Sequence, residues 1–312
     1  MSVFRQDIYI HNNRAVPDGR TEKLMRNCVI VTDSSCDLPR ELVEEYGIKV
    51  LSLRVDIDGV GSFRNHEIDP KEFYDYMRNK HTAKTSAANM DSFCEVFEQL
   101  AKEGNDILYI GFSTGLSATY MAGKNAADEI MEKYPDCKIV TVDSLCASLG
   151  QGLLVKYAVD KKNEGADIDT LAKYVTELVP HMAHWFTVDD LVYLKRGGRV
   201  SAATAVMGTV LQIKPVMHMD NDGKLINVAK ARGRDASIKA IFEKMKESAI
   251  EPRKQSQVFI CHGDCYDDAK KLADMVTAEF GIEDILIGYT GPVIGAHSGP
   301  GTLALFFIAK ER

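Results

Sequence analysis

Three hydroxyl side chains, Ser113, Thr114 and Ser117, stand close together in the segment GFSTGLSATY, which runs from Gly111 to Tyr120. The segment follows DILYIGF, an apolar run that predicts a buried strand, and precedes a stretch whose apolar spacing predicts a helix. Hydroxyl groups at such a junction cap a helix, while the free N–H groups of the first helical turn favour an anion such as carboxylate or phosphate. The sequence therefore leaves two roles open here, helix capping and anion binding.

The same segment matches G-x-S-x-G, the strand-to-helix turn that exposes the nucleophile of many hydrolases, with Ser113 in the serine position. Asp264 and His297 follow in the chain order that this triad requires. However, nothing upstream resembles the HGGG oxyanion loop, and a hydrolase sheet would not change character after Ser113. A serine hydrolase is therefore an alternative hypothesis.

A second hydroxyl pair, Thr85 and Ser86, precedes a helix that should begin near Asn89 or Met90. Capping of that helix explains the pair as well as ligand contact does. His297 lies in GPVIGAHSGPGT, where glycines on both sides allow the backbone to approach a ligand closely. Its two open roles are a partner for a carboxylate and a structural histidine.

Two short segments, RGGRVS (Arg196 to Ser201) and AKARGRDAS (with Arg232 and Arg234), combine arginine with glycine. Arginines beside such turns can hold a phosphate or the carboxylate of a partner, and a solvated loop is an equally good explanation. Neither G-x-G-x-x-G nor G-x-x-x-x-G-K-[ST] occurs, so the sequence gives no case for a nucleotide site.

Two histidine- or cysteine-containing segments raise the question of a metal. HMAH contains His181 and His184, and CHGDC contains Cys261, His262 and Cys265. Neither set reaches four ligands at a recognised zinc spacing. We expect a solvated helix face for HMAH, a strand end for CHGDC, and no metal or other cofactor.

The first half of the chain alternates short apolar runs with amphipathic stretches. CVIVTDS, IKVLSLRVDI, DILYIGF and CKIVTVDS predict strands, and helices are predicted between and after them. Strand–helix alternation is typical of a parallel sheet. We therefore predict an N-terminal α/β domain over residues 27–184, preceded by an extension over residues 1–26.

The pattern changes beyond His184, where short strands are interrupted by helices at about Ser201–Gln212, Arg234–Ala249 and Tyr266–Phe280. DNDGK predicts a hairpin turn between two of these strands. Residues 185–312 should form an α+β domain with a mostly antiparallel sheet. Because no flexible linker separates the halves, we expect them to pack closely around a cleft.

The composition is that of a globular protein. Its 312 residues exceed the roughly 250–300 at which one core usually divides, and a net charge of −7 gives no reason to expect a nucleic acid as partner. Seven scattered cysteines favour reduced thiols. Because no segment reaches the roughly 18 apolar residues of a membrane helix or has the form of a signal peptide, we expect a cytoplasmic protein.

Eight segments together resemble the DegV family of bacterial lipid-binding proteins between about Cys28 and Ile308. In chain order they are VTDSSCDLP, KTSAANMDSF, GFSTGLSATY, VDSLCASLGQG, LKRGGRVS, KPVMHMDNDGKL, KARGR and GPVIGAHSGPGTLALFF. The chain departs from the family at Ala87-Ala88, where Gln-Pro is usual, and at LSATY, where LSGTY is usual. Neither departure removes a polar group that would hold a ligand.

The resemblance implies two α/β domains with a long-chain fatty acid buried between them. It also implies a protein that is not catalytic alone, since some members carry the acyl group for a bacterial fatty acid kinase and present the carboxylate to a separate ATP-binding subunit that makes acyl phosphate. By position, the carboxylate would be surrounded by Thr85, Ser86, either Ser113 or Ser117, and His297. Arg232 or Arg234 would serve the encounter with the kinase subunit.

A fatty acid binding protein of this type is the leading hypothesis. Two alternatives remain: a serine hydrolase that uses Ser113 and His297, and a sensor of a phosphorylated ligand that uses the helix-terminal loops and the arginines. Bound fatty acid should be insensitive to salt, whereas a phosphorylated ligand should be released at high salt.

Overall fold

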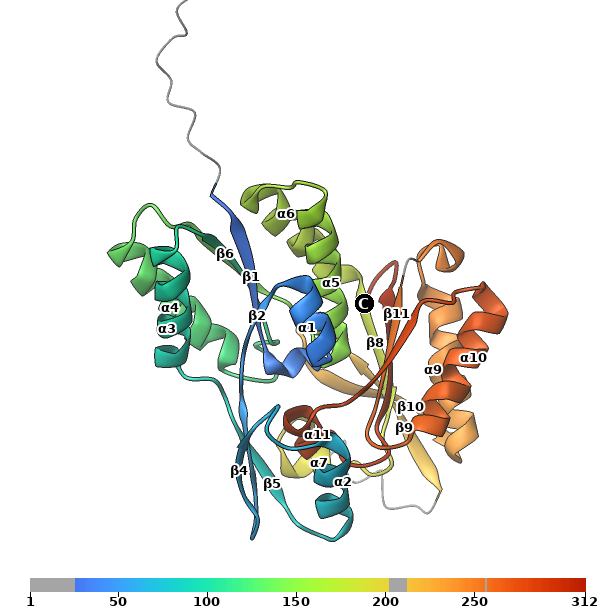
Figure 1. Ribbon diagram of the computed structural model, residues 1–312. Coiled ribbons are helices and arrows are strands. Elements are labelled where there is room, and N and C mark those ends of the chain that lie inside the picture. The colour runs from blue at the N-terminus through green and yellow to red at the C-terminus, as the bar shows by residue number, and fades with distance from the viewer. Residues whose placement is uncertain (1–25, 202–211, 256) are drawn as a thin grey trace, which may run out of the picture.

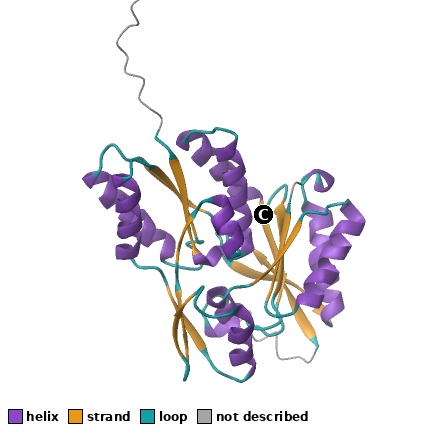
Figure 2. Ribbon diagram, in the orientation of Figure 1, coloured by secondary structure: helices purple, strands orange, loops and turns teal. Residues whose placement is uncertain are grey.

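The computed structural model describes residues 26–201, 212–255 and 257–312 (Figure 1). These residues form one four-stranded sheet, one six-stranded sheet and a smaller three-stranded sheet, with helices packed around them (Figure 2). The four-stranded sheet is parallel and the six-stranded sheet is mostly antiparallel. The predicted fold class, mixed α/β with two kinds of sheet, is confirmed.

The parallel sheet has the strand order β2-β1-β6-β7. Its strands are β1 (Cys28–Asp33), β2 (Lys49–Leu51), β6 (Asp106–Gly111) and β7 (Ile139–Asp143). The helices around it are α1 (Arg40–Tyr46), α3 (Met90–Lys102), α4 (Thr119–Lys133), α5 (Leu149–Asn163) and α6 (Ile168–Leu178). In β1, Ile30 packs in the core that contains α5 and α6, and Val31 packs in the core that contains α3 and α4. Because both faces are covered, β1 and β6 are continuous apolar runs rather than alternating ones.

The second sheet has the order β10-β9-β8-β13-β11-β12, and only β11 and β12 pair in parallel. Its strands are β8 (Met182–Thr187), β9 (Ile213–Met219), β10 (Leu225–Arg232), β11 (Val258–His262), β12 (Ile285–Tyr289) and β13 (Leu303–Ile308). Helices α9 (Arg234–Ser248) and α10 (Tyr266–Phe280) cover one face. Both helices and the hairpin turn between β9 and β10 were predicted, and all three are confirmed.

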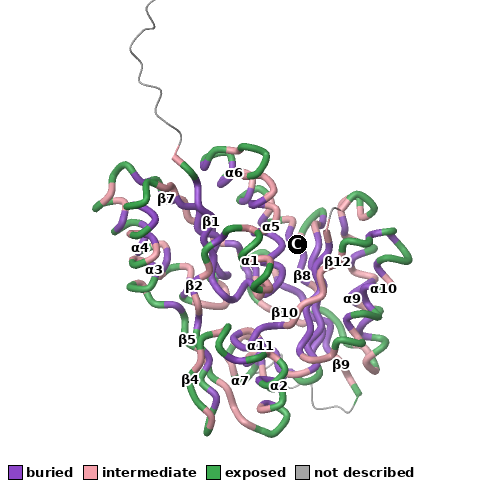
Figure 3. The backbone as a smooth tube through the Cα atoms, viewed as in Figure 1, coloured by how far each residue is buried: buried purple, intermediate pink, exposed green. Residues whose placement is uncertain are grey.

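Helix α5 lies between the two large sheets (Figure 1) and contacts β1 and β6 of one and β8, β11 and β13 of the other. Nine of its residues are buried, including its first seven. The helix therefore has no continuous polar face, as expected for a helix with a sheet on each side. Figure 3 shows this buried layer between the halves of the molecule, in contrast to the exposed outer face of α1.

The third sheet has the order β4-β3-β5 and was not predicted. It consists of β3 (Arg54–Ile57), β4 (Gly61–Arg64) and β5 (Ala83–Ser86). The prediction of one strand over IKVLSLRVDI was wrong, because the run is divided between β2 and β3. The backbone N–H of Leu53 donates to Ser34 Oγ (2.9 Å) rather than to a strand, so the pairing of β2 ends at Leu51 and the chain turns into a different sheet.

Helices α2 (Pro70–Arg78) and α11 (Pro292–Ser298) lie beside this small sheet, and α7 (Val192–Arg196) packs against α11 (Figure 1). Although α11 lies near the C-terminus, it contacts α2, β3 and β5 from the first half of the chain. The two halves of the sequence are thus joined through this layer. The short α11 carries His297 to the junction of the sheets.

The change from the first large sheet to the second occurs at the turn η2 (Val179–His181). The boundary that we predicted after His184 therefore falls inside β8. Residues 1–25 of the predicted extension, and residues 202–211 of the predicted helix Ser201–Gln212, lie outside the described residues. Within the described ranges, every helix is too short or too polar to span a bilayer.

Candidate functional site

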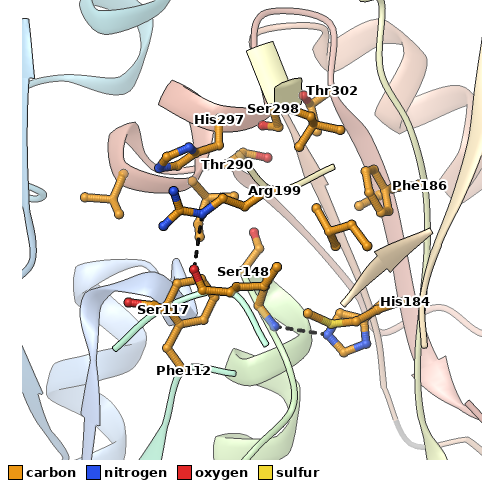
Figure 4. A pocket seen from close by; sticks show the side chains of 18 of the residues that line it. Phe112, Ser117, Ser148, His184, Phe186, Arg199, Thr290, His297, Ser298 and Thr302 are labelled. Carbon is orange, nitrogen blue, oxygen red and sulfur yellow. Dashed lines mark hydrogen bonds between the residues drawn. The ribbon is translucent and has the colours of Figure 1, made fainter. Parts of the chain in front are cut away.

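A cavity of about 300 Å³ lies where the three sheets meet (Figure 4). Leu53 and Phe112 contribute to its wall from the first half of the chain, and Phe186, Met219 and Phe306 contribute from the second sheet. Aliphatic and aromatic groups form most of the wall. The cavity can therefore hold an apolar ligand, and its few polar groups must determine how that ligand is oriented.

Thr85 and His297 form the first polar contact of the cavity wall. Thr85 Oγ1 lies 2.7 Å from His297 Nε2, and both side chains line the cavity. Thr85 belongs to β5 and His297 to α11, so the contact joins residues 212 positions apart. The fold therefore brings these two predicted site residues into contact.

Gly197 fixes the position of the His297 ring. A Cβ atom at this glycine would lie 2.1 Å from His297 Nδ1, which is closer than any side chain permits. The Nδ1 atom is buried and has no hydrogen-bond partner among the described residues. Gly197, the first glycine of RGGR, is thus needed so that the C-terminal end of α7 can pack against the His297 ring.

Arg199 also belongs to this cluster; our sequence analysis named its segment, RGGRVS, but did not assign it to the carboxylate site. Its Nε donates to the carbonyl of Leu116 (3.1 Å), and another of its N–H groups donates to the carbonyl of Gly197. These bonds hold the guanidinium between His297 and Ser117 at one side of the cavity (Figure 4). The signal was present in RGGR, but the spacing could not show which arginine turns inward, since Arg196 instead lies over the Tyr193 ring.

The environment of His297 keeps its imidazole neutral. Burial, and then the nearby positive charge of Arg199, lower the pKa of His297 from 6.5 to about 4. Burial also lowers the pKa of Arg199, but a guanidinium remains charged in proteins at neutral pH. The cluster at pH 7 thus contains one cation and several hydrogen-bonding groups, which suits a single carboxylate.

The depressed pKa of His297 predicts a loss of stability in acid. In the unfolded chain this residue takes up a proton near pH 6.5, whereas in the folded chain it does so near pH 4. The ligand-free protein should therefore lose up to about 3 kcal/mol of its free energy of unfolding between these pH values through this group. We expect His297→Gln to remove that contribution, which urea unfolding at pH 7 and pH 4.5 would measure. An equal acid-induced loss in both proteins would contradict the prediction.

The structure distinguishes between Ser113 and Ser117. Ser117 lines the cavity, and its Oγ accepts from the backbone N–H of Thr119 (3.2 Å) at the start of α4. Ser113 is completely buried and donates to the carbonyl of Gly223 (2.8 Å) in the β9–β10 turn. Ser113 therefore fastens the hairpin of the second sheet to the first half, and Ser117 is the serine that faces the cavity.

Thr85 and Ser86 are likewise separated by the structure. Successive side chains of a strand point to opposite faces, and in β5 Thr85 lines the cavity whereas Ser86 is exposed. Of the residues predicted around the carboxylate, the cavity wall contains Thr85, Ser117 and His297. Ser86 and Ser113 are directed elsewhere.

Arg232 and Arg234 also differ in their surroundings. Arg234 is largely buried, donates from Nε to Asp268 Oδ2 (2.8 Å) and lies near Cys265 and Asp189. Arg232 is exposed on β10, the edge strand of the second sheet. Of these two arginines, Arg232 is the one whose side chain is exposed at the surface.

The residues of the alternative hydrolase triad are not joined to one another. Ser113 is bonded to Gly223, and His297 to Thr85. Asp264 accepts from Arg78 of α2 and from the Tyr289 hydroxyl (3.4 Å). The geometry therefore gives no support to the serine hydrolase hypothesis.

The expected helix face at HMAH is wrong for His184, which is a buried residue of β8 and lines the cavity. His184 Nε2 accepts from the backbone N–H of Ala147 (3.3 Å), and Nδ1 bonds to the carbonyl of Met182 (2.9 Å). Burial lowers the pKa of His184 well below 6.5, so the ring is neutral. Among the described residues, no group of three His, Cys, Asp or Glu side chains could hold a metal ion.

The model of the DegV family, whose members are described as uncharacterised proteins, matches residues 27–310. A DegV domain-containing protein of Clostridium perfringens is 44% identical over 290 residues, which cover 92% of this chain and 99% of that protein. The likeness therefore extends over both large sheets and over every residue of the cavity cluster.

Two solved structures are also similar to this chain. A DegV family protein from Thermus thermophilus, described by its fatty acid binding, has a TM-score of 0.81 and 27% identity, with 91% of this chain and 99% of that one covered. A stearic acid-binding protein from Eubacterium ventriosum has a TM-score of 0.81 and 26% identity, with 90% and 98% covered. Both similar proteins bind fatty acids.

Proposed function

The chain belongs to the DegV family, and on this premise we propose that it binds a long-chain fatty acid in the cavity between its sheets. The carboxylate lies among Thr85, Ser117, His297 and Arg199, and the tail lies along the apolar wall. The observation that carries the proposal is the combination of one half-buried cluster of polar groups, which contains the cation Arg199, with an otherwise apolar cavity.

Each part of this cavity has a separate physical task. A carboxylate that leaves water must recover its hydrogen bonds, or the cost of desolvation would cancel the gain from the tail. Hydroxyl groups and the Arg199 guanidinium supply the donors. The contact with His297 orients the Thr85 hydroxyl, and the bond to the Leu116 carbonyl orients the guanidinium. A sixteen-carbon tail gains on the order of ten kcal/mol, at about 0.8 kcal/mol per buried CH₂, before ordering costs.

Native mass spectrometry of the purified chain, followed by organic extraction, tests the proposal directly. We expect a mass excess that yields a long-chain fatty acid and that persists at high salt, because burial of a tail does not depend on ionic strength. Release at high salt would favour a phosphorylated ligand instead. A protein that is empty and does not take up added stearate would refute the proposal.

The matched pair Thr85→Val and Ser86→Ala tests where the carboxylate binds. Thr85→Val should weaken stearate binding about fivefold, because a neutral hydrogen bond contributes about 1 kcal/mol. Ser86→Ala removes an exposed hydroxyl on the other face of β5 and should leave the dissociation constant unchanged. Displacement of a fluorescent fatty acid would measure both. Equal effects of the two substitutions would place the carboxylate elsewhere.

We further propose that the protein is not catalytic alone and that it presents its bound fatty acid to the ATP-binding subunit of a fatty acid kinase. The exposure of Arg232 on the edge strand β10 supports a partner at this surface, whereas Arg234 is paired with Asp268. An exposed arginine steers the approach of a complementary acidic surface. Arg232 is therefore the residue of the pair that serves the encounter.

Arg232→Glu should reduce acyl phosphate formation in a mixture with the cognate ATP-binding subunit, because the new charge repels an acidic partner. We expect the rate at subsaturating concentration to fall about tenfold at low salt, with fatty acid binding unchanged. Arg253→Glu makes the same charge change in the 3-10 helix η4 (Pro252–Lys254) and serves as the control. If Arg232→Glu forms acyl phosphate at the wild-type rate, Arg232 is not part of the interface with the kinase subunit.

A further inference from the structure

Several polar side chains line the cavity away from the carboxylate cluster, and most have partners within the protein. Thr302 Oγ1 donates to the carbonyl of Gly299 (2.7 Å), and Thr290 Oγ1 donates to Cys261 Sγ (3.0 Å). These groups are satisfied without a ligand. They can form part of the wall beside an apolar chain at little cost.

Ser148 is also satisfied, although its backbone is unusual. Its Oγ donates to Asp37 Oδ2 (2.5 Å), and its φ of 53° with a ψ of −148° is a conformation that residues other than glycine rarely adopt. Burial raises the pKa of Asp37 to about 7. The strained turn therefore directs this hydroxyl to the carboxyl of Asp37 and away from any ligand.

Ser298 is the exception. Its side chain lines the cavity, the residue is 5% exposed, and its Oγ has no hydrogen-bond partner among the described residues. Figure 4 shows Ser298 and His297 on the same helix at the edge of the cavity. A buried hydroxyl without a partner destabilises the folded protein, and a ligand that supplied a partner would remove that cost.

The place of Ser298 in the chain limits where that partner can be. Ser298 follows His297 directly in α11, and the Cα atoms of neighbouring residues are about 3.8 Å apart. Both side chains also line the cavity, so a carboxylate beside His297 places the first few carbons of the chain near Ser298. The cavity position that needs a polar ligand atom is close to the carboxylate.

We propose that the preferred ligands are fatty acids with a hydroxyl group near the carboxyl end, such as 3-hydroxy acids, and that Ser298 Oγ pairs with this hydroxyl. The inference rests on the proposed function, because it places the carboxylate beside His297. A hydroxyl at that place exchanges its bonds to water for a bond to Ser298. A hydroxyl far along the tail meets an apolar wall and should weaken binding.

The test compares stearate, both enantiomers of 3-hydroxystearate, and 12-hydroxystearate by displacement of a fluorescent fatty acid from the full chain. We expect one 3-hydroxy enantiomer to bind about fivefold tighter than stearate, as one added hydrogen bond predicts, and 12-hydroxystearate to bind more weakly. In Ser298→Ala, the preference for the 3-hydroxy acid should disappear while stearate binds as before. Ser86→Ala, the same substitution on an exposed surface, should keep the preference.

Three results would overturn the inference. The first is a wild-type protein that binds stearate but prefers neither 3-hydroxy enantiomer. The second is a preference that survives in Ser298→Ala. The third is an equal loss of stearate and 3-hydroxystearate in Ser298→Ala with an unchanged melting temperature, because Ser298 would then bind the carboxylate itself. A wild-type protein that binds no acid would instead refute the proposed function and, with it, this inference.

Discussion

Ala304→Trp is expected to weaken stearate binding by two orders of magnitude or more. Ala304 lies in β13, opposite Phe186 of β8 and Cys261 of β11, and all three residues line the cavity. An indole at this point occupies space that the tail needs. If it excludes four CH₂ groups at about 0.8 kcal/mol each, the loss is about 3 kcal/mol, or about two hundredfold in the dissociation constant.

The controls for this prediction vary the ligand and the site. Octanoate, whose short tail does not need the far part of the cavity, should bind equally to the wild-type and Ala304→Trp proteins. Ala278→Trp, on the exposed side of α10, should leave stearate binding unchanged. Stearate that bound Ala304→Trp with wild-type affinity would show that the tail follows a different path.

Arg199→Met is expected to weaken stearate binding about tenfold to a hundredfold and to leave octadecanol binding nearly unchanged. A hydrogen bond to a charged group contributes about 1.5–3 kcal/mol, and only the carboxylate of the acid gains from the guanidinium. Methionine keeps most of the aliphatic length of the side chain. The ratio of the dissociation constants of stearate and octadecanol, both measured by displacement of the same fluorescent ligand, reports the contribution of the charge interaction.

The matched control is Arg196→Met, which removes the arginine that lies over the Tyr193 ring. This variant should bind stearate like the wild type. Arg199 also bonds to the carbonyls of Leu116 and Gly197, so its loss could disturb the loop that carries it. A fall in octadecanol binding as large as that in stearate binding would assign Arg199 a structural role instead.

Local patterns in the sequence were sufficient for most of the secondary structure and for the family. Apolar runs such as DILYIGF predicted buried strands because both faces of the parallel sheet are covered. Apolar spacing predicted α9 and α10, and the DNDGK turn predicted the β9–β10 hairpin. The motif order predicted the DegV family, which the family match over residues 27–310 confirms.

The residues of the cavity cluster depended on contacts that local patterns do not determine. The hydroxyl pairs Thr85-Ser86 and Ser113/Ser117 were each ambiguous, because the register of β5 and the docking of the β9–β10 turn decide which member faces the cavity. The small sheet was missed because the end of β2 depends on a hydrogen bond from Leu53 to Ser34.

Sequence patterns predicted the strands of the two large sheets, most helices, the family and a short set of candidates with the chemistry to hold a carboxylate. Only the packed chain shows that Thr85 and Ser117, rather than Ser86 and Ser113, line the cavity with His297. It also shows that Arg199 joins them and that Ser298 lines the cavity without a hydrogen-bond partner among the described residues. The physical reason is the distance along the chain over which each kind of interaction acts. Periodicity and turn propensity act over a few neighbouring residues, whereas this cluster is built from β5, the β6–α4 loop, the turn after α7 and α11, which only the packing of the sheets around α5 brings together.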